Sequence, residues 1–307
     1  MRPLRGILLK LISVLIFIVM ASMIKTTAGS VPAGETVFFR SFFAIPVIVA
    51  WLALQGELAT GFQAAAPLGH VWRGIMGTTA MGLGFAGLGY LPLPEVTAIG
   101  YAAPLLTVVF AAMFLGEEVR IFRIAAVFLG IVGVMIVLSP RLTVLNGEVA
   151  GHREAFGAML VLGGAVFAAL AQVFVRKLVK TEKTAAIVFW FSLTGSGLSL
   201  LTIPFGWVVP TVPQAATLVA AGLLGGVGQI FLTASYREAD ASLVAPFDYA
   251  SMIFALAIGY FVFNEVPTWT MLSGASLVIF AGILIIWRER KLGLERAAQR
   301  KSMTPQG

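Results

Sequence analysis

The carboxylate of Asp248 lies within an apolar stretch, the segment "SLVAPFDYASMIF" over residues 242–254. A charged carboxylate at the centre of a membrane helix costs about 2.5–3.5 kcal/mol, so such a residue faces a cavity, a partner or a proton. Two interpretations follow for Asp248. It contacts a solute or exchanges a proton, or it ties its helix to a neighbouring one without taking part in turnover.

Arg40 is the second ionisable residue inside an apolar run, in "FFRSFF" over residues 38–43. One interpretation is that its side chain extends toward the membrane surface or clamps helix-end carbonyls. The other is an anion contact or gate that faces a cavity. Arg40 is expected roughly 10 Å below the outer membrane edge and Asp248 roughly 10 Å from the inner edge. A direct pair therefore requires one side chain to reach toward the other.

Three aromatic side chains are further candidates for lining a site. Tyr101 and Tyr249 occupy equivalent places in two similar stretches of the chain, described below, and a tyrosine near mid-span can stack on a planar solute and hydrogen-bond to it. Trp190 is the third. Plain packing is the alternative for each, and the weaker candidates Gln172 and Gln229 are equally explained by hydrogen bonds between helices.

The sequence contains few of the residue patterns that enzymes use for catalysis. The chain has no cysteine, so thiolate metal sites, disulfides and cysteine nucleophiles are excluded. Its two histidines, His70 and His152, are expected on opposite sides of a membrane. The glycine pattern in "GLGFAGLG" (82–89) follows no predicted strand, which favours close helix contact over nucleotide binding. We expect no metal, no cofactor and no enzymatic activity.

The composition is that of an integral membrane protein. Of 307 residues, 59% are hydrophobic and only 11% are charged, against about a quarter charged in a soluble domain. About ten apolar segments are long enough for a helix to cross a hydrocarbon core. Their predicted limits are 7–28, 33–54, 71–90, 92–114, 121–139, 155–176, 185–206, 213–235, 242–263 and 268–287.

The basic residues predict the orientation of these spans. If both termini are cytoplasmic, the outer loops contain Lys25, Arg141 and Arg153, and Lys10 and Arg40 fall within spans. The remaining 16 of the 21 basic residues then lie on the inner side. This bias favours cytoplasmic termini and an even number of spans. It also accounts for the net charge of +7 without a nucleic-acid partner.

The chain contains an internal repeat. "YAAPLLTVVFAAMFLGEE" begins at Tyr101 and "YASMIFALAIGYFVFNEV" begins at Tyr249; aligned without a gap, Glu117 meets Glu265. This divides the chain into halves at 7–139 and 155–287, followed by a basic cytoplasmic tail over 288–307. Because each half has an odd number of spans, the second is inverted relative to the first, as in many secondary transporters. Pro104 and Pro246 fall inside equivalent spans, where each is expected to kink the helix or form part of a hinge.

The same segments resemble the EamA family of the drug/metabolite transporter superfamily. The resemblance is carried by "FFRSFF" (38–43), "LPLPEVTAIGYAAPLLTVVFAAMFLGEEV" (91–119) and "ASLVAPFDYASMIFALAIGYFVFNEVP" (241–267), and it covers nearly the whole chain. It implies ten helices in two inverted five-helix repeats around a central cavity. Within the family the chain is loosely similar to riboflavin-uptake and S-adenosylmethionine-uptake members. One departure is Asn264 in place of Gly116, and Asn serves equally at a helix end that needs a left-handed residue.

The sequence therefore predicts a secondary transporter of the inner or plasma membrane that moves a small metabolite by alternating access, with Asp248 as either a solute contact or a site of proton coupling. The expected contacts are Arg40, Tyr101, Trp190, Asp248 and Tyr249. Riboflavin is the first substrate hypothesis, and export of aromatic amino acids or uptake of S-adenosylmethionine is the alternative. The rival class is a non-transporting membrane enzyme or assembly partner. Partners are the lipid bilayer and a small solute, and the oligomeric state is left open.

Overall fold

The computed structural model describes residues 3–58, 60–115, 121–142, 149–178, 181–238 and 245–303. These residues form helices joined by short connections, and none of them lies in a β-strand, which confirms the all-α prediction for the described part. The first half of the chain contains α1 (Pro3–Thr27), α2 (Ala33–Phe42), α3 (Ala44–Leu54), α4 (Pro67–Leu88), α5 (Leu93–Gly100), α6 (Ala102–Leu115) and α7 (Ile121–Leu142). The second contains α8 (Val149–Leu178), α9 (Thr184–Leu200), η2 (Ile203–Phe205), α10 (Val212–Glu238), η3 (Ala245–Tyr249), α12 (Ala250–Phe263) and α13 (Trp269–Met303).

The helices have the length and composition of membrane spans. Among the described residues, six segments are long and apolar enough to cross a bilayer. They are Leu4–Thr27, Ala33–Leu54, Leu93–Phe110, His152–Val175, Val212–Leu232 and Trp269–Arg288. Shorter apolar helices cover Ile124–Pro140, Thr184–Leu200 and Phe247–Phe263. The protein is thus a multi-pass membrane protein.

Prolines explain where several helices end. Pro46 lies four residues after Phe42, the last residue of α2, and Pro104 lies four residues after Gly100, the last residue of α5. A proline lacks the N–H that would bond to the carbonyl four residues earlier, and its ring clashes with that carbonyl. The prediction that Pro104 interrupts its span is confirmed, because the break between α5 and α6 falls at Tyr101. Pro246 lies within η3, directly before α12.

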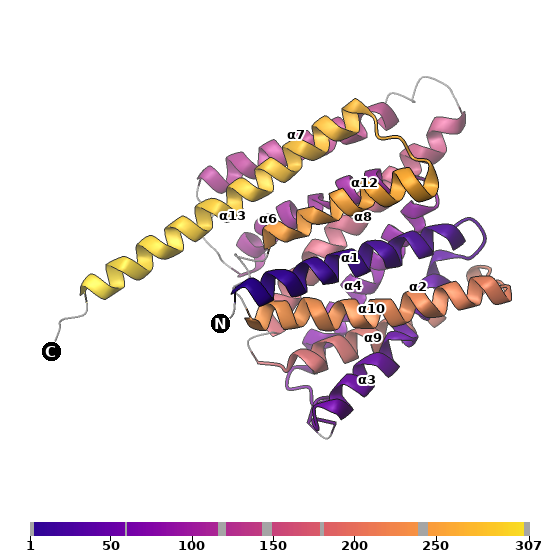
Figure 1. Ribbon diagram of the computed structural model, residues 1–307, viewed down its shortest axis with the longest axis horizontal. Helices are drawn as coiled ribbons and strands as arrows, with labels where there is room; N and C mark the ends of the chain where they lie inside the picture. The colour runs from indigo at the N-terminus through magenta and orange to yellow at the C-terminus, as the bar shows by residue number, and fades with distance from the viewer. Residues whose placement is uncertain are drawn as a thin grey trace.

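Helices from the two halves of the sequence pack against each other along most of their length. Figure 1 shows α1 beside α10 and α7 beside α13, and α4 packs along α8 in the same way. α2 lies against both α9 and α10. α1 begins and α13 ends toward the same end of the bundle (Figure 1), which we call the N-terminal end. The opposite end, where α1 reaches Thr27, is the far end.

Two buried carboxylates, one at each end of the bundle, each bind a loop from the opposite half of the chain. At the far end, Glu35 in the first turn of α2 accepts a hydrogen bond of 3.1 Å from the backbone N–H of Val208, between α9 and α10. At the N-terminal end, Glu182, two residues before the start of α9, accepts a hydrogen bond of 2.6 Å from the N–H of Ala66, between α3 and α4. Both carboxylates are almost fully buried. Each therefore holds a loop that comes from the other half of the chain.

The structure corrects several sequence-based boundaries. α13 continues to Met303, so most of the predicted tail at 288–307 extends the last helix. α4 begins at Pro67, four residues before the predicted limit of 71, so Arg73 lies in the second turn of that helix. The prediction for Asn264 is confirmed, because it caps α12 with φ 55° and ψ 32° in the left-handed region. Glu117 lies outside the described residues.

α7 and α13 cross at two glycines, and this contact yields a prediction about stability. A Cβ added to Gly274 would lie 2.6 Å from the backbone oxygen of Gly133 and 2.8 Å from the backbone nitrogen of Val137. Because backbone atoms cannot rotate away, we expect Gly274→Ala to separate the helices and cost about 1–3 kcal/mol. The thermal unfolding midpoint of the solubilised protein measures this. Gly84→Ala is the matched control, since nothing lies within 4 Å of its added Cβ, and an equal loss in both variants would contradict the prediction.

Candidate functional site

Tyr101 and Tyr249 meet where two spans are interrupted. Tyr101 follows the last residue of α5, and Tyr249 directly precedes α12. Their ring centroids are 5.0 Å apart in an edge-to-face arrangement, and both residues are buried. The Tyr101 hydroxyl lies 2.6 Å from Oγ of Ser251, and that hydroxyl donates to the carbonyl of Asp248 at 2.7 Å. The two halves of the chain are thus joined by this tyrosine contact.

Asp248 forms an ion pair with Lys10 of α1. The Lys10 Nζ lies 2.7 Å from Oδ1 of Asp248; the lysine side chain is 2% exposed and the aspartate side chain is 46% exposed. A buried ammonium requires compensation by an opposite charge, and Asp248 supplies it. Lys10 was expected within a span, but its pairing with Asp248 was not predicted from the sequence. The carboxylate faces open space on one side and a buried cation on the other.

Arg40 lies at another level of the bundle from Asp248. A Cβ added to Gly225 would lie 3.2 Å from the Arg40 Nε and 3.1 Å from the sulfur of Met20 on α1. Met20 follows Lys10 by ten residues, which is about 15 Å along a helix. The prediction that Arg40 and Asp248 differ in depth is consistent with this placement. Asp248 pairs with Lys10, whereas Arg40 lies against Phe191 of α9, with its guanidinium carbon 5.5 Å from the ring centroid.

A second ion pair joins α1 to the same span at the far end. The Lys25 Nζ lies 2.9 Å from Oε1 of Glu265, just beyond α12, and donates to the carbonyl of Leu91 at 2.7 Å. Oε2 of Glu265 accepts a hydrogen bond of 2.9 Å from the N–H of Leu93, at the start of α5. Both charged side chains are mostly buried, with 14% and 15% exposed. This ion pair between Lys25 and Glu265 was not predicted from the sequence.

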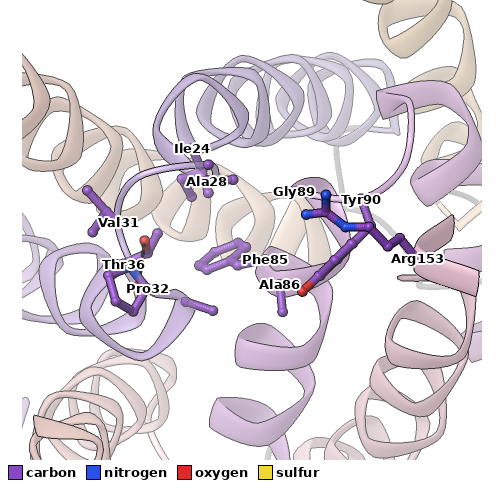
Figure 2. A pocket seen from close by; sticks show the side chains of 12 residues that line it. Ile24, Ala28, Val31, Pro32, Thr36, Phe85, Ala86, Gly89, Tyr90 and Arg153 are labelled. Carbon is purple, nitrogen blue, oxygen red and sulfur yellow. Dashed lines mark hydrogen bonds between the residues drawn. The ribbon is translucent and has the colours of Figure 1, made fainter. Parts of the chain in front are cut away.

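A cavity of about 280 Å³ opens at the far end of the bundle. Its walls come from the end of α1, the start of α2, the end of α4 and the start of α8. Figure 2 shows Phe85 and Thr36 on its wall, with Tyr90 and Arg153 at one side. The predicted contact residues do not line this cavity. Neither Lys25 nor Glu265 lines this cavity, although Lys25 directly follows the lining residue Ile24 on α1.

Trp190 has a different environment from the other predicted contacts. Its Nε1 donates a hydrogen bond of 2.9 Å to the carbonyl of Phe62, in the connection between α3 and α4, and its ring centroid is 6.4 Å from that of His70. The indole therefore fastens a loop at the N-terminal end of the bundle.

Trp190→Phe separates loop attachment from solute contact. Phenylalanine keeps the ring packing and removes the hydrogen bond to Phe62, so we expect a loss of about 1 kcal/mol of stability and an unchanged solute affinity. The unfolding midpoint and the KM of transport are the two measurements. A raised KM with an unchanged midpoint would instead assign Trp190 to the solute site, as the sequence predicted.

The structure thus brings together three of the five predicted residues, Tyr101, Asp248 and Tyr249. Arg40 lies elsewhere, near a second arginine with buried guanidinium nitrogens, Arg73. Lys10 and Arg73 were not predicted as site residues. In the sequence, each of the two is recognisable only as a basic residue close to the start of an apolar helix.

The family is decided by comparison with known proteins. The model of the EamA-like transporter family matches residues 4–139 and again residues 155–288. The chain belongs to the EamA-like transporter family. This confirms the resemblance seen in the sequence. One solved crystal structure shares the fold of this EamA-family chain with a TM-score of 0.65 at 20% identity, covering 94% of this chain and 98% of the other.

Several relatives of this chain are described as transporters or exporters. The pseudopaline exporter CntI of Pseudomonas aeruginosa is 29% identical over 287 residues, covering 91% of this chain and 95% of the relative. The S-adenosylmethionine uptake transporter of Rickettsia bellii is 28% identical, with 84% of each chain covered. The riboflavin transporter of Rhizobium johnstonii is 27% identical, with 85% of this EamA-family chain and 83% of the relative covered.

Proposed function

We propose that this protein is a secondary transporter that moves a small organic solute across the inner or plasma membrane by alternating access. It has ten spans in two inverted five-helix repeats, over 7–139 and 155–287, followed by the basic segment 288–307. The first-repeat spans are α1, α2–α3, α4, α5–α6 and α7. The second-repeat spans are α8, α9, α10, η3–α12 and α13.

The reciprocal packing of the helices supports the inverted repeat. The first span of each half lies along the third span of the other, because α1 packs on α10 and α8 packs on α4. The second spans begin beside Glu35 and Glu182, which hold equivalent loops of the opposite half. The fourth spans meet at equivalent tyrosines. An inverted repeat produces such pairs at both ends, since its halves exchange places under a two-fold rotation.

The ends of the chain support cytoplasmic termini. α1 begins and α13 ends toward the same end of the bundle (Figure 1). The described basic residues Arg288 and Lys291 lie where α13 leaves the apolar segment that ends at Arg288. Positively charged residues next to a span favour the cytoplasmic side. The N-terminal end is therefore the cytoplasmic end in this proposal, and the far end faces outward.

The observation that carries the transport proposal is the pair of charged ties between α1 and the ninth span. Lys10–Asp248 lies toward the cytoplasmic end and Lys25–Glu265 lies at the outer end. Each tie joins one repeat to the other. An alternating-access protein needs contacts between its halves that break at one end while they hold at the other. Protonation of Asp248 would weaken the inner tie, which links a proton to opening at the cytoplasmic side.

Transport by the purified full-length protein in vesicles tests this function. The solute panel contains riboflavin, S-adenosylmethionine and aromatic amino acids, each in uptake and efflux, with and without a proton gradient. We expect gradient-driven accumulation of at least one solute and none in empty vesicles. Absence of any protein-dependent flux, together with a dry interface between the halves, would favour the rival class of non-transporting membrane protein.

A further inference from the structure

Two arginines from different helices place buried guanidinium nitrogens against one aromatic ring. The guanidinium carbon of Arg40 on α2 is 5.5 Å from the centroid of Phe191, and that of Arg73 on α4 is 3.8 Å from it. Arg40 is only 3% exposed. α2 and α4 begin at opposite ends of the bundle, and each arginine lies in the second turn of its helix. Their side chains therefore converge on Phe191 from opposite directions, near the middle of the bundle.

The described residues give these guanidinium groups little compensation. Nε and Nη1 of both arginines are buried, and no residue in the described ranges accepts a hydrogen bond from them. No described carboxylate forms an ion pair with either arginine. Interaction with an aromatic face offsets only part of the cost of removing a charge from water. Two like charges that share one ring also repel each other.

Three hydroxyl groups on the same helices as Arg40, Arg73 and Phe191 are unpaired as well. Oγ of Ser41, Oγ1 of Thr78 and Oγ of Ser192 are buried and have no hydrogen-bond partner among the described residues. A Cβ added to Gly195 would lie 2.7 Å from the Ser41 hydroxyl and 3.4 Å from that of Thr78, so these two side chains share one space. Buried polar groups are almost always satisfied. A cluster of unsatisfied donors around two cations indicates an absent acceptor.

Gly77 leaves the space that the Arg73 guanidinium occupies beside Phe191. A Cβ added to Gly77 would clash with the Arg73 Nη1 and lie 2.8 Å from the Phe191 ring, so a side chain at Gly77 would displace the guanidinium. Thr36, on the wall of the cavity in Figure 2, precedes Arg40 by one helical turn. Phe85, also on the wall, follows Thr78 by about two turns along α4.

We propose that Arg40 and Arg73 bind an oxyanion of the transported solute, with the hydroxyls of Ser41, Thr78 and Ser192 as further donors. The solute is then an organic anion or a zwitterion that carries a carboxylate or a phosphate ester. Guanidinium groups suit such groups because their N–H donors match two oxygens at once. Riboflavin is uncharged at neutral pH, so it has no negative charge to compensate the two arginines. The inference rests on the proposed transport function and specifies its substrate class.

Ligand-induced thermal stabilisation of the full-length protein in lipid nanodiscs tests the proposal. The probes are phenylalanine, tryptophan and S-adenosylmethionine, the methyl esters of the two aromatic amino acids, glycerol 3-phosphate, riboflavin and chloride. We expect at least one carboxylate or the phosphate ester to stabilise the protein, and the matching methyl ester to bind about tenfold more weakly. Stabilisation by a carboxylate compound would identify a carboxylate site, and stabilisation by glycerol 3-phosphate would identify a phosphate-ester site. No stabilisation by any oxyanion, or equal stabilisation by chloride, would overturn the proposal.

Arginine variants give a second, independent readout. Arg73→Gln and Arg40→Gln are expected to weaken binding of the anion by about tenfold or more. They are also expected to raise the unfolding midpoint of the unliganded protein, since each removes an uncompensated buried charge. Arg288→Gln is the matched control, because Arg288 lies 5.9 Å from the Phe122 ring and outside the cluster. Lower midpoints with unchanged anion binding would show a purely structural role and contradict the proposal.

The transport and anion proposals fail in different ways. If an uncharged solute is transported equally by the wild type and both arginine variants, the anion site is wrong and the transporter stands. If the anion binds through both arginines but no solute crosses the membrane, the transporter is wrong and the site stands.

Discussion

Asp248→Asn is expected to abolish accumulation of the solute against its gradient while exchange of solute across the membrane continues. Asparagine keeps the shape of the side chain but can neither carry the proton nor form the charged contact of 2.7 Å with Lys10. If proton binding at Asp248 controls the inner tie, its loss uncouples the gradient from the movement of the halves. The measurement compares gradient-driven uptake with counterflow exchange in the same vesicles.

Two controls make the result specific to Asp248. Asp248→Glu keeps a titratable carboxylate and should retain part of the accumulation. Glu238→Gln removes another carboxylate that pairs with a basic residue of α1, Arg5, at 3.2 Å, and it should leave accumulation unchanged. Accumulation at the wild-type rate and with the wild-type pH dependence in Asp248→Asn would remove the proton role. Asp248 would then be a structural tie to α1.

Reversing the charge of Lys25 is expected to lower the initial rate of transport by about tenfold or more. Lys25→Glu places two carboxylates together at the outer end and removes the donor to the carbonyl of Leu91. Repulsion then keeps the outer end open, and the cycle stops in one state. The double variant Lys25→Glu with Glu265→Lys restores opposite charges and should recover much of the rate.

An exposed ion pair provides the comparison for this charge reversal. Lys183 lies 3.5 Å from Glu57, with 47% and 45% of the two side chains exposed. Exposed pairs contribute little, so Lys183→Glu should change the rate by less than about twofold. If Lys25→Glu transports at the wild-type rate, or if the double variant is no better than the single one, the outer tie has no role in transport.

Much of the fold was accessible from the sequence because apolar runs and prolines act locally. The break at Tyr101 follows from Pro104, and the left-handed cap at Asn264 follows from its place after a helix. The ends of helices were harder to predict where a helix continues beyond its apolar segment. α13 extends to Met303 because nothing in its basic segment stops a helix, and α4 includes Arg73 because it begins at Pro67.

The candidate site was less accessible, because it depends on which helices meet. The type and position of Asp248 indicated a compensated charge, but only packing of η3 on α1 identifies Lys10 as its partner. The equivalence of Tyr101 and Tyr249 in the repeat anticipated their contact. Trp190 and Arg40 look alike in the sequence as polar groups within spans, yet one holds a loop and the other lies in a buried cluster.

The central claim is that the two ends of the bundle open in alternation, and distances between spin labels test it most directly. The chain has no cysteine, so introduced cysteines are the only labelling sites. The outer pair is Gly29 and Val266, and the inner pair is Leu54 and Trp287, all at exposed positions in different halves. With the transported solute and at acidic pH, we predict that one distance lengthens while the other shortens. Two distances that stay fixed, or that lengthen together, in protein that transports the solute would contradict the account.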